Sequence, residues 1–278
     1  MAPRVAVVGH VEWIEFARVP RLPRPGEIVH ASEWWQDVGG GGAVSAVQLA
    51  RLAGEVEFFT ALSEDELGLR SRARLRELGV RVHAAPREGA QRRGFVYLDG
   101  DGERTITILG ERIVPRGDDD LPWERLGDVD AVYFTGGDAA ALRAARRARR
   151  VVATPRAYAT LREAAVRLDA LVRSSQDPGE KDAGDDLEPP PAVIVSTAGR
   201  EGGHWVAEDH SRGTWTAVEL PGPMRDAYGA GDSFAAGLTY GLGAGLPVEE
   251  AVHVAARCGA HKLAGRAIYE GQLTAAEL

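Results

Sequence analysis

Short apolar segments alternate with helical segments along most of this 278-residue chain. Runs such as Val5 to Gly9, Ala131 to Phe134 and Val193 to Ser196 are almost entirely apolar, and the stretches between them carry apolar residues at helical spacing. Strands without a polar face are typical of a sheet that is covered on both sides. The alternation therefore predicts an α/β fold with an open, mostly parallel sheet and helices on both faces.

Two stretches, residues 11–38 and 91–110, interrupt the alternation and are called the lid segments below. Both have strand character, and Asp99-Gly100-Asp101-Gly102 has the turn chemistry of a hairpin within the second segment. The two segments could pair in space as a small sheet over one edge of the core. By contrast, residues 174–191 are polar, acidic and proline-rich, which predicts disorder or a long surface loop.

Charge and composition exclude several classes of protein. A net charge of −8 argues against sequence-independent nucleic-acid binding, which needs a basic surface. A single cysteine, Cys258, excludes a disulfide framework. The N-terminus does not read as a signal peptide, and no stretch approaches the roughly 18 apolar residues that span a membrane. We therefore expect a cytoplasmic protein with neither nucleic-acid nor membrane partners.

The most informative segment for function is residues 225–236, with the sequence RDAYGAGDSFAA. Two glycines flank an alanine at 229–231, so the backbone can turn tightly and a ligand can approach it closely. The apolar stretch 234–242 follows, so the turn should open a helix N-terminus that attracts an anion. Asp232 at this position could accept a proton from a hydroxyl that attacks a phosphoryl group. The alternative is an ordinary strand-to-helix turn with a capping aspartate.

This segment resembles the C-terminal signature D-T-x-G-A-G-D-x-F of the ribokinase/PfkB-type carbohydrate kinases, with Ala227 in place of the threonine. The resemblance implies that Asp232 is the catalytic base. It also implies an anion hole for the transferred phosphoryl group, formed by the backbone amides of Gly229, Ala230 and Gly231. ATP would be the donor, and Mg²⁺ would bridge its phosphates.

The same resemblance implies two further binding sites. Asp226 would help to hold a monovalent cation such as K⁺. Residues 195–203 resemble the strand and glycine-containing loop that bind the nucleotide in this family. Thr197, Gly199 and Gly202 would therefore lie beneath the nucleotide.

The N-terminal half also resembles the family. Residues 7–9, 25–27 and 39–46 resemble its first strand ending in glycine, its lid motif P-G-E and its G-G-x-x-x-N-x-A helix. The resemblance thus covers nearly the whole chain and implies a single ribokinase-like kinase domain over residues 1–278. Such a domain has a three-layer α/β/α core, a mostly parallel sheet and a small β lid, here built from the lid segments.

The departures from the family pattern lie on the substrate side. Val44 stands where the family has asparagine, and no residue matches its substrate-binding aspartate. Glu12 is our candidate for a substrate hydroxyl contact, although an exposed acid at a strand edge would look the same. The N-x-x-E motif that orders magnesium and phosphate is absent near residue 174, where only Asp177 or Glu180 could partly replace it.

Four consecutive glycines, Gly39, Gly40, Gly41 and Gly42, precede a helical pattern. No Lys-Ser/Thr pair follows them as in a P-loop, and the third glycine of a dinucleotide fingerprint is missing. They suit close approach by a polyhydroxyl ligand, or a flexible hinge between lid and core.

Three tryptophans, Trp13, Trp34 and Trp35, lie in the first lid segment. They could stack on a sugar or base. Equally, they could pack a homodimer interface formed through the lid. His10 and His30 have no partners at metal-ligand spacing, so no metal site is assigned to them.

These observations predict an ATP-dependent phosphotransferase acting on a hydroxyl, expected to be a primary one, of a sugar, sugar phosphate or nucleoside. The alternative is a non-catalytic regulatory protein of the same fold that binds a sugar or nucleotide. The intact Asp232 argues against this alternative, because a binding protein gains nothing from a base there. A Rossmann-type oxidoreductase is disfavoured because the first strand is not followed by a dinucleotide fingerprint.

Overall fold

The structure, a computed structural model, describes residues 2–278. Its centre is a nine-stranded sheet with the order β13-β12-β11-β10-β9-β8-β1-β4-β5. From β11 to β5 the strands are parallel, while β12 and β13 continue the sheet antiparallel. The strands are β1 (Val5–Val8), β4 (Glu57–Ser63), β5 (Arg81–Arg87), β8 (Ala131–Phe134), β9 (Arg150–Ala153), β10 (Ala170–Ser174), β11 (Val193–Thr197), β12 (Gly203–Ala207) and β13 (Arg212–Trp215).

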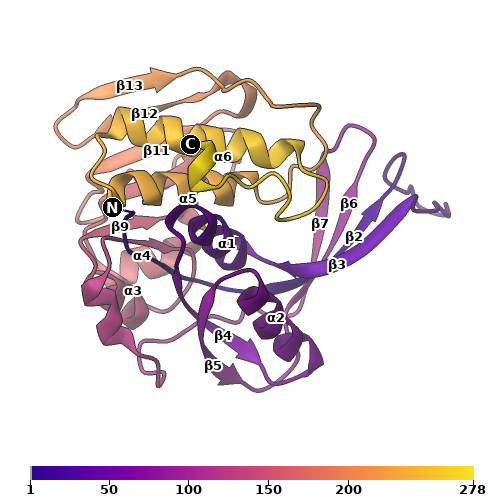
Figure 1. Ribbon diagram of the computed structural model, residues 1–278, viewed down its shortest axis with the longest axis horizontal. Helices are drawn as coiled ribbons and strands as arrows, with labels where there is room; N and C mark the ends of the chain where they lie inside the picture. The colour runs from indigo at the N-terminus through magenta and orange to yellow at the C-terminus, as the bar shows by residue number, and fades with distance from the viewer. Residues whose placement is uncertain (1) are drawn as a thin grey trace.

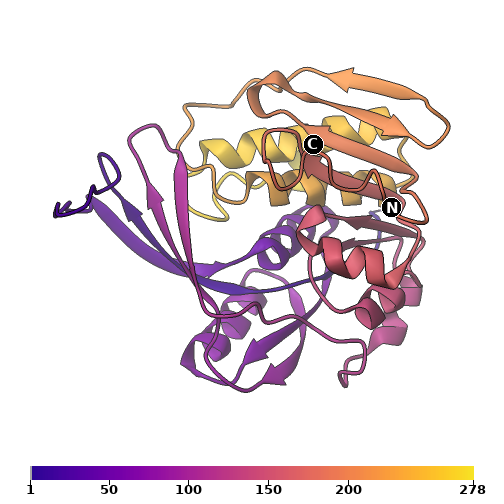
Figure 2. The same ribbon diagram turned by 180° about the vertical axis from the view of Figure 1, so that it is seen from behind.

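Helices cover both faces of this sheet, as Figures 1 and 2 show from opposite sides. Val5 and Val7 of β1 pack into one hydrophobic cluster, and Ala6 and Val8 pack into a second on the other face. This explains why the strand has no polar side and confirms the predicted three-layer architecture. The first face carries α1 (Gly41–Ala53), α2 (Glu66–Glu77), α5 (Ala230–Gly243) and α6 (Val248–Ala264); the second carries the 3₁₀ helix η1 (Trp123–Asp128), α3 (Ala139–Ala145) and α4 (Tyr158–Ala164).

The lid segments form a second, four-stranded sheet that projects from one side of the core (Figure 1). Its order is β3-β2-β6-β7, with β2 antiparallel to β3 and parallel to β6. Distant parts of the chain therefore pair as the sequence predicted, and β6 and β7 form the predicted hairpin. The strands are β2 (Glu12–Arg18), β3 (Glu33–Gly39), β6 (Arg93–Leu98) and β7 (Arg104–Leu109).

The three lid tryptophans have different environments. Trp35 stacks on Phe16 with ring centroids 4.9 Å apart, and Phe16 meets Tyr228 edge-on at 5.3 Å. Trp13 is buried and lies under the guanidinium of Arg70, 4.4 Å from its ring centroid. Trp34 alone is largely exposed, at 61%. Two of the three tryptophans therefore stabilise the lid and its contact with the core.

The apolar spacing of residues 139–150 and 157–168 predicts a helix over each range, and both helices are shorter in the structure. α3 ends at Ala145, before β9 begins at Arg150. α4 ends at Ala164, where Ala165 adopts a left-handed conformation. β5 was not predicted from the sequence. Residues 174–191 form a loop of turns, and no helix among the described residues has the length and hydropathy needed to cross a membrane.

Candidate active site

The candidate site lies at the carboxyl ends of the parallel strands, where the strand order reverses. β1 has β4 on one side and β8 on the other. After β1 the chain adds β4 and β5 on one side of the sheet, and the strands from β8 onwards are added on the other side. Ligands of open α/β sheets bind in the crevice at such a reversal. The loops that follow β1, β8 and β9 bring His10, Thr135 and Arg156 to this edge.

Asp232 lies in the first turn of α5 and faces Gly41, at the start of α1. A Cβ atom added to Gly41 would lie 2.8 Å from Asp232 Oδ1 and 3.0 Å from Thr135 Oγ1. Burial raises the pKa of Asp232 to about 6; Arg104 and Arg156 oppose this rise, and Glu180 adds to it. The carboxylate therefore ionises close to neutral pH, as a general base should.

The turn before Asp232 has the geometry of an anion site. Gly229 caps α5 with φ 78°, and a Cβ there would lie 2.9 Å from Val44. The side chain of Asp232 makes no capping hydrogen bond, so the interpretation of this residue as a helix cap is wrong. Within residues 2–278 the amides of Gly229, Gly231 and Asp232 have no acceptor, and Ala230 has only a long contact of 3.5 Å. Free amides at a helix N-terminus attract anions.

Asp226 does not fit the predicted monovalent cation site. Its Oδ1 accepts a hydrogen bond of 2.8 Å from the amide of Tyr228, and its Oδ2 lies 3.4 Å from Lys262 Nζ. Both side chains of the Asp226–Lys262 pair are 0% exposed. The buried ammonium therefore supplies the positive charge that the sequence analysis assigned to K⁺.

The four glycines allow α1 to approach the loop after β1. Added Cβ atoms would lie 2.7 Å from Ile14 at Gly39, 3.0 Å from the Glu12 amide nitrogen at Gly40, and 2.6 Å from the His10 carbonyl at Gly42. All three of these glycines are buried, whereas Gly41 is partly accessible and borders Asp232. Close packing accounts for three of the four, and Gly41 alone borders the carboxylate of Asp232.

Glu12 is buried beside an arginine. Its Oε1 lies 2.8 Å from Arg92 Nε and 3.8 Å from His10 Nε2. Burial raises the pKa of Glu12, and Arg92 and Arg112 oppose the rise. The predicted substrate acid is thus at the site, but it is already engaged with a guanidinium.

The predicted nucleotide loop follows β11. Gly199 and Gly202 both have positive φ, 57° and 88°. A Cβ on Gly202 would lie 2.0 Å from the Trp215 carbonyl oxygen, so this glycine is required by packing against β13. Thr197 donates a hydrogen bond of 3.3 Å to the Arg173 carbonyl and closes the end of the strand. These contacts hold the loop at the same edge of the sheet as Asp232.

Two carboxylates lie in the loop after β10, where the family motif for magnesium is missing. Arg156 bridges them, 2.6 Å from Asp177 and 2.5 Å from Glu180. The Glu180 side chain is 11% exposed and also accepts a 3.0 Å hydrogen bond from the Ser174 amide. Mg²⁺ is commonly held by one or two carboxylates together with substrate phosphates, so these oxygen donors fit it. The Arg156 side chain is 57% exposed and can move aside.

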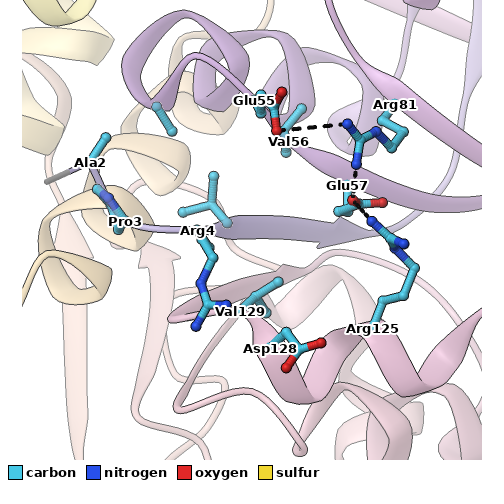
Figure 3. Close-up of a pocket in the computed structure, with 12 residues that line it drawn as sticks. Ala2, Pro3, Arg4, Glu55, Val56, Glu57, Arg81, Arg125, Asp128 and Val129 are labelled. Atoms are coloured by element: carbon cyan, nitrogen blue, oxygen red, sulfur yellow. Dashed lines mark hydrogen bonds and ion pairs between the residues drawn. The ribbon is translucent and has the colours of Figure 1, made fainter.

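A separate cavity of about 510 Å³ lies at the opposite, amino-terminal edge of the sheet (Figure 3). Its charged side chains neutralise one another: Arg81 and Arg125 both bind Glu57, at 2.8 Å and 2.6 Å. It lies away from Asp232 and is not the candidate site.

Sequence reasoning missed several residues of the site. Arg92, Arg112 and His10 gather around Glu12, and Lys262 lies behind Asp226. Among 31 arginines, spacing gave no signal that singled out two of them. Lys262 could have been noticed, because it is one of only two lysines in the chain.

Gly41→Ala should slow the reaction without unfolding the protein. The new methyl group would lie 2.8 Å from Asp232 Oδ1 and displace that carboxylate, and a shift of about 1 Å can cost roughly 100-fold in rate. Thermal denaturation should change little, because alanine is favourable in a helix. Gly127→Ala, which would place its methyl group in open space, is the matched control. A Gly41→Ala enzyme with wild-type kcat would contradict the assigned geometry.

Comparison with known proteins gives a consistent result. The family described as pfkB family carbohydrate kinase matches residues 2–177 and 168–269 of this chain. The ATP-dependent ribose-1-phosphate kinase of Halopiger xanaduensis is 28% identical over 134 residues, which cover 48% of this chain and 45% of that protein. The ribokinase of Staphylococcus aureus is 25% identical over 113 residues, covering 40% and 37%. The chain thus aligns with less than half the length of these curated relatives.

Solved structures share the whole fold. Ribokinase from Thermotoga maritima matches with a TM-score of 0.81 at 21% identity, covering 99% of this chain and 97% of that chain. Ribokinase from Arabidopsis thaliana, solved with ribose and ATP, matches with a TM-score of 0.75 at 20% identity, covering 96% and 94%. Likeness at this level of identity confirms the expected ribokinase-like architecture.

Proposed function

Because this chain belongs to the pfkB family of carbohydrate kinases, we propose that it transfers a phosphoryl group from ATP to a hydroxyl of a sugar, sugar phosphate or nucleoside. We propose that the kinase unit spans the chain, with the lid segments as part of it. One observation carries the proposal: a carboxylate with raised pKa lies beside free amides at a helix N-terminus, at the strand-order reversal.

In this proposal Asp232 accepts the proton of the attacking hydroxyl. The amides of the turn, Gly229 to Asp232, stabilise the charge on the transferred phosphoryl group. Loss of one such donor typically costs about 3–4 kcal/mol of transition-state stabilisation. The nucleotide would lie along the loop that contains Thr197, Gly199 and Gly202.

Mg²⁺, when bound with ATP, would neutralise charge on the phosphates. Asp177 and Glu180 are the residues of this chain that would hold it. Arg156, which bridges both carboxylates, would then be free to contact a phosphate oxygen. Lys262 takes the place of a monovalent cation behind the turn, so the reaction should not require K⁺.

The lid would exclude water from the transferred group. Its inner face already contacts the turn through Phe16 and Tyr228. Trp34, exposed on β3, is where a homodimer through the lid would bury apolar surface.

The proposal is tested by ADP release with ATP and Mg²⁺ against pentoses, hexoses, their phosphates and nucleosides. Turnover with one acceptor, lost in the Asp232→Asn protein, is the expected result. Absence of turnover across the panel while ATP still binds would favour the regulatory alternative.

The rate should fall on the acid side of pH 6. The pKa of Asp232 is raised, so the active carboxylate is protonated at a higher pH than for an ordinary aspartate. Below about pH 6, kcat/KM should drop about tenfold per pH unit. Glu180→Gln should move the acid limb of the pH–rate profile to lower pH, because Glu180 adds to the rise in the pKa of Asp232. The titration of the acceptor itself is measured separately, and a flat profile down to pH 4.5 would contradict the assignment.

A further inference from the structure

Positive charge exceeds negative charge beside Glu12. Arg92 Nε lies 2.8 Å from Glu12 Oε1, which matches one guanidinium with one carboxylate. Arg112 lies close by: burial and repulsion from Arg92 lower its pKa, and Glu12 opposes the lowering. Within residues 2–278 Arg112 has no carboxylate partner, and its Nη1 donates to the Arg156 carbonyl at 3.1 Å. Glu12 therefore has two guanidinium groups near it and is paired with one of them, Arg92.

His10 completes this cluster as a neutral group. Burial, together with Arg112 and Arg92, lowers its pKa to about 3. Its side chain is 7% exposed, and its Nδ1 is buried without a hydrogen-bond partner in the described residues. Arg92 Nε is likewise buried without a well-aligned hydrogen bond. The cluster thus offers one positive charge without a carboxylate partner, on Arg112, and one buried ring nitrogen, His10 Nδ1, without a hydrogen-bond partner in the described residues.

The cluster and the candidate base lie on either side of two consecutive glycines. A Cβ on Gly40 would lie 3.2 Å from Glu12 Cγ, and a Cβ on Gly41 would lie 2.8 Å from Asp232 Oδ1. Consecutive Cα atoms are about 3.8 Å apart, so a molecule of sugar size can span from Asp232 to the guanidinium groups. The charge of Asp232 is also close enough to raise the pKa of Glu12.

We propose that the acceptor carries an anionic group, a phosphate or a carboxylate, which Arg112 and Arg92 bind while its hydroxyl faces Asp232. The inference rests on the proposed kinase function and narrows its substrate class. The planar fork of a guanidinium matches both anionic groups, and a neutral sugar or nucleoside would leave Arg112 without a counter-charge. Glu12 acts in this arrangement as the residue that positions Arg92.

Kinetics with matched acceptors test the proposal: ribose against ribose 1-phosphate and ribose 5-phosphate, and glucose against gluconate. An anionic acceptor should exceed its neutral parent in kcat/KM by about 100-fold. Arg112→Gln should raise KM for that acceptor about 10- to 100-fold with kcat nearly unchanged, and Arg112→Lys should be intermediate. A neutral acceptor used as well as its anionic counterpart would overturn the inference and leave the kinase function standing.

Binding of inorganic phosphate, measured by calorimetry without ATP, separates the two proposals. Phosphate should bind wild type and Asp232→Asn alike and weaken in Arg112→Gln. Arg112 lies outside the helices and strands and has no ion-pair partner among the described residues, so its loss should not impair folding. Arg143→Gln, which removes an exposed, unpaired charge on α3, should change nothing. If the protein shows no turnover but binds phosphate through Arg112, only the proposed kinase function is refuted. If phosphate binds equally well to the Arg112→Gln protein, the proposed anion site is refuted.

Discussion

Replacing Asp232 with asparagine should abolish turnover while leaving fold and nucleotide affinity nearly unchanged. Asparagine keeps the shape of the side chain but cannot accept the proton of the attacking hydroxyl. General-base catalysis typically contributes about 10²- to 10⁴-fold, so the residual rate should be at most about 1%. Single-turnover kinetics measure the chemical step directly, and calorimetry with ATP measures the binding that should survive.

Asp138→Asn is a suitable control for this experiment. Asp138 also lies at a helix N-terminus, where its side chain accepts a hydrogen bond of 2.8 Å from the Ala141 amide. Its replacement tests the effect of losing a helix-terminal charge on α3, at a residue with no proposed role in the reaction, and the rate should stay near wild type. If Asp232→Asn kept more than a few per cent of the wild-type rate, Asp232 would not be the base.

Replacing Lys262 with methionine should cause the largest loss of stability. Methionine has a side chain of similar length to that of lysine, but the buried carboxylate of Asp226 loses its counter-charge. Burial raises the pKa of Asp226 and lowers that of Lys262, and each partner opposes the shift in the other. Breaking a buried pair in this way costs about 3–5 kcal/mol in the free energy of unfolding. Urea denaturation measures it.

The double variant Lys262→Met/Asp226→Asn should recover most of that loss, because no uncompensated charge remains. Lys181→Met is the matched control, since the only other lysine lies 56% exposed beside Asp182. A loss below about 1 kcal/mol in the single variant would mean that water reaches Asp226. Turnover of the wild type should also be the same in potassium and in choline salts, because the ammonium is internal.

The fold was predictable because burial on both faces imposes a simple pattern. Strands such as β1 are apolar at every position, and Val5 and Val7 serve one core while Ala6 and Val8 serve the other. β5 was missed because an edge strand is covered less completely. Its sequence, RVHAAPR, has only two buried residues, Val82 and Ala85, and includes a proline.

The candidate site was predictable only where backbone groups form it, as in the glycine turn before Asp232. The turn before Asp232 needs glycine at 229, where φ is 78° and Val44 leaves no room for a side chain. Arg92 and Lys262 contact Glu12 and Asp226 from distant parts of the chain, and such long-range contacts cannot be read from the local sequence. Asp226 is a further example, because its ion-pair partner Lys262 lies 36 positions away; the cation site expected at Asp226 stays a prediction.

The hydrogen bond from the Gly40 amide to the hydroxyl of Tyr228 joins residues 188 positions apart. The start of α1 and the turn before α5 must therefore meet before Asp232 can face Gly41. Contacts of such sequence separation require closure of most of the chain. A nascent chain that ends before residue 228 cannot form this contact. In the proposed function, phosphoryl transfer would therefore become possible only after residues 40 and 228 have come together.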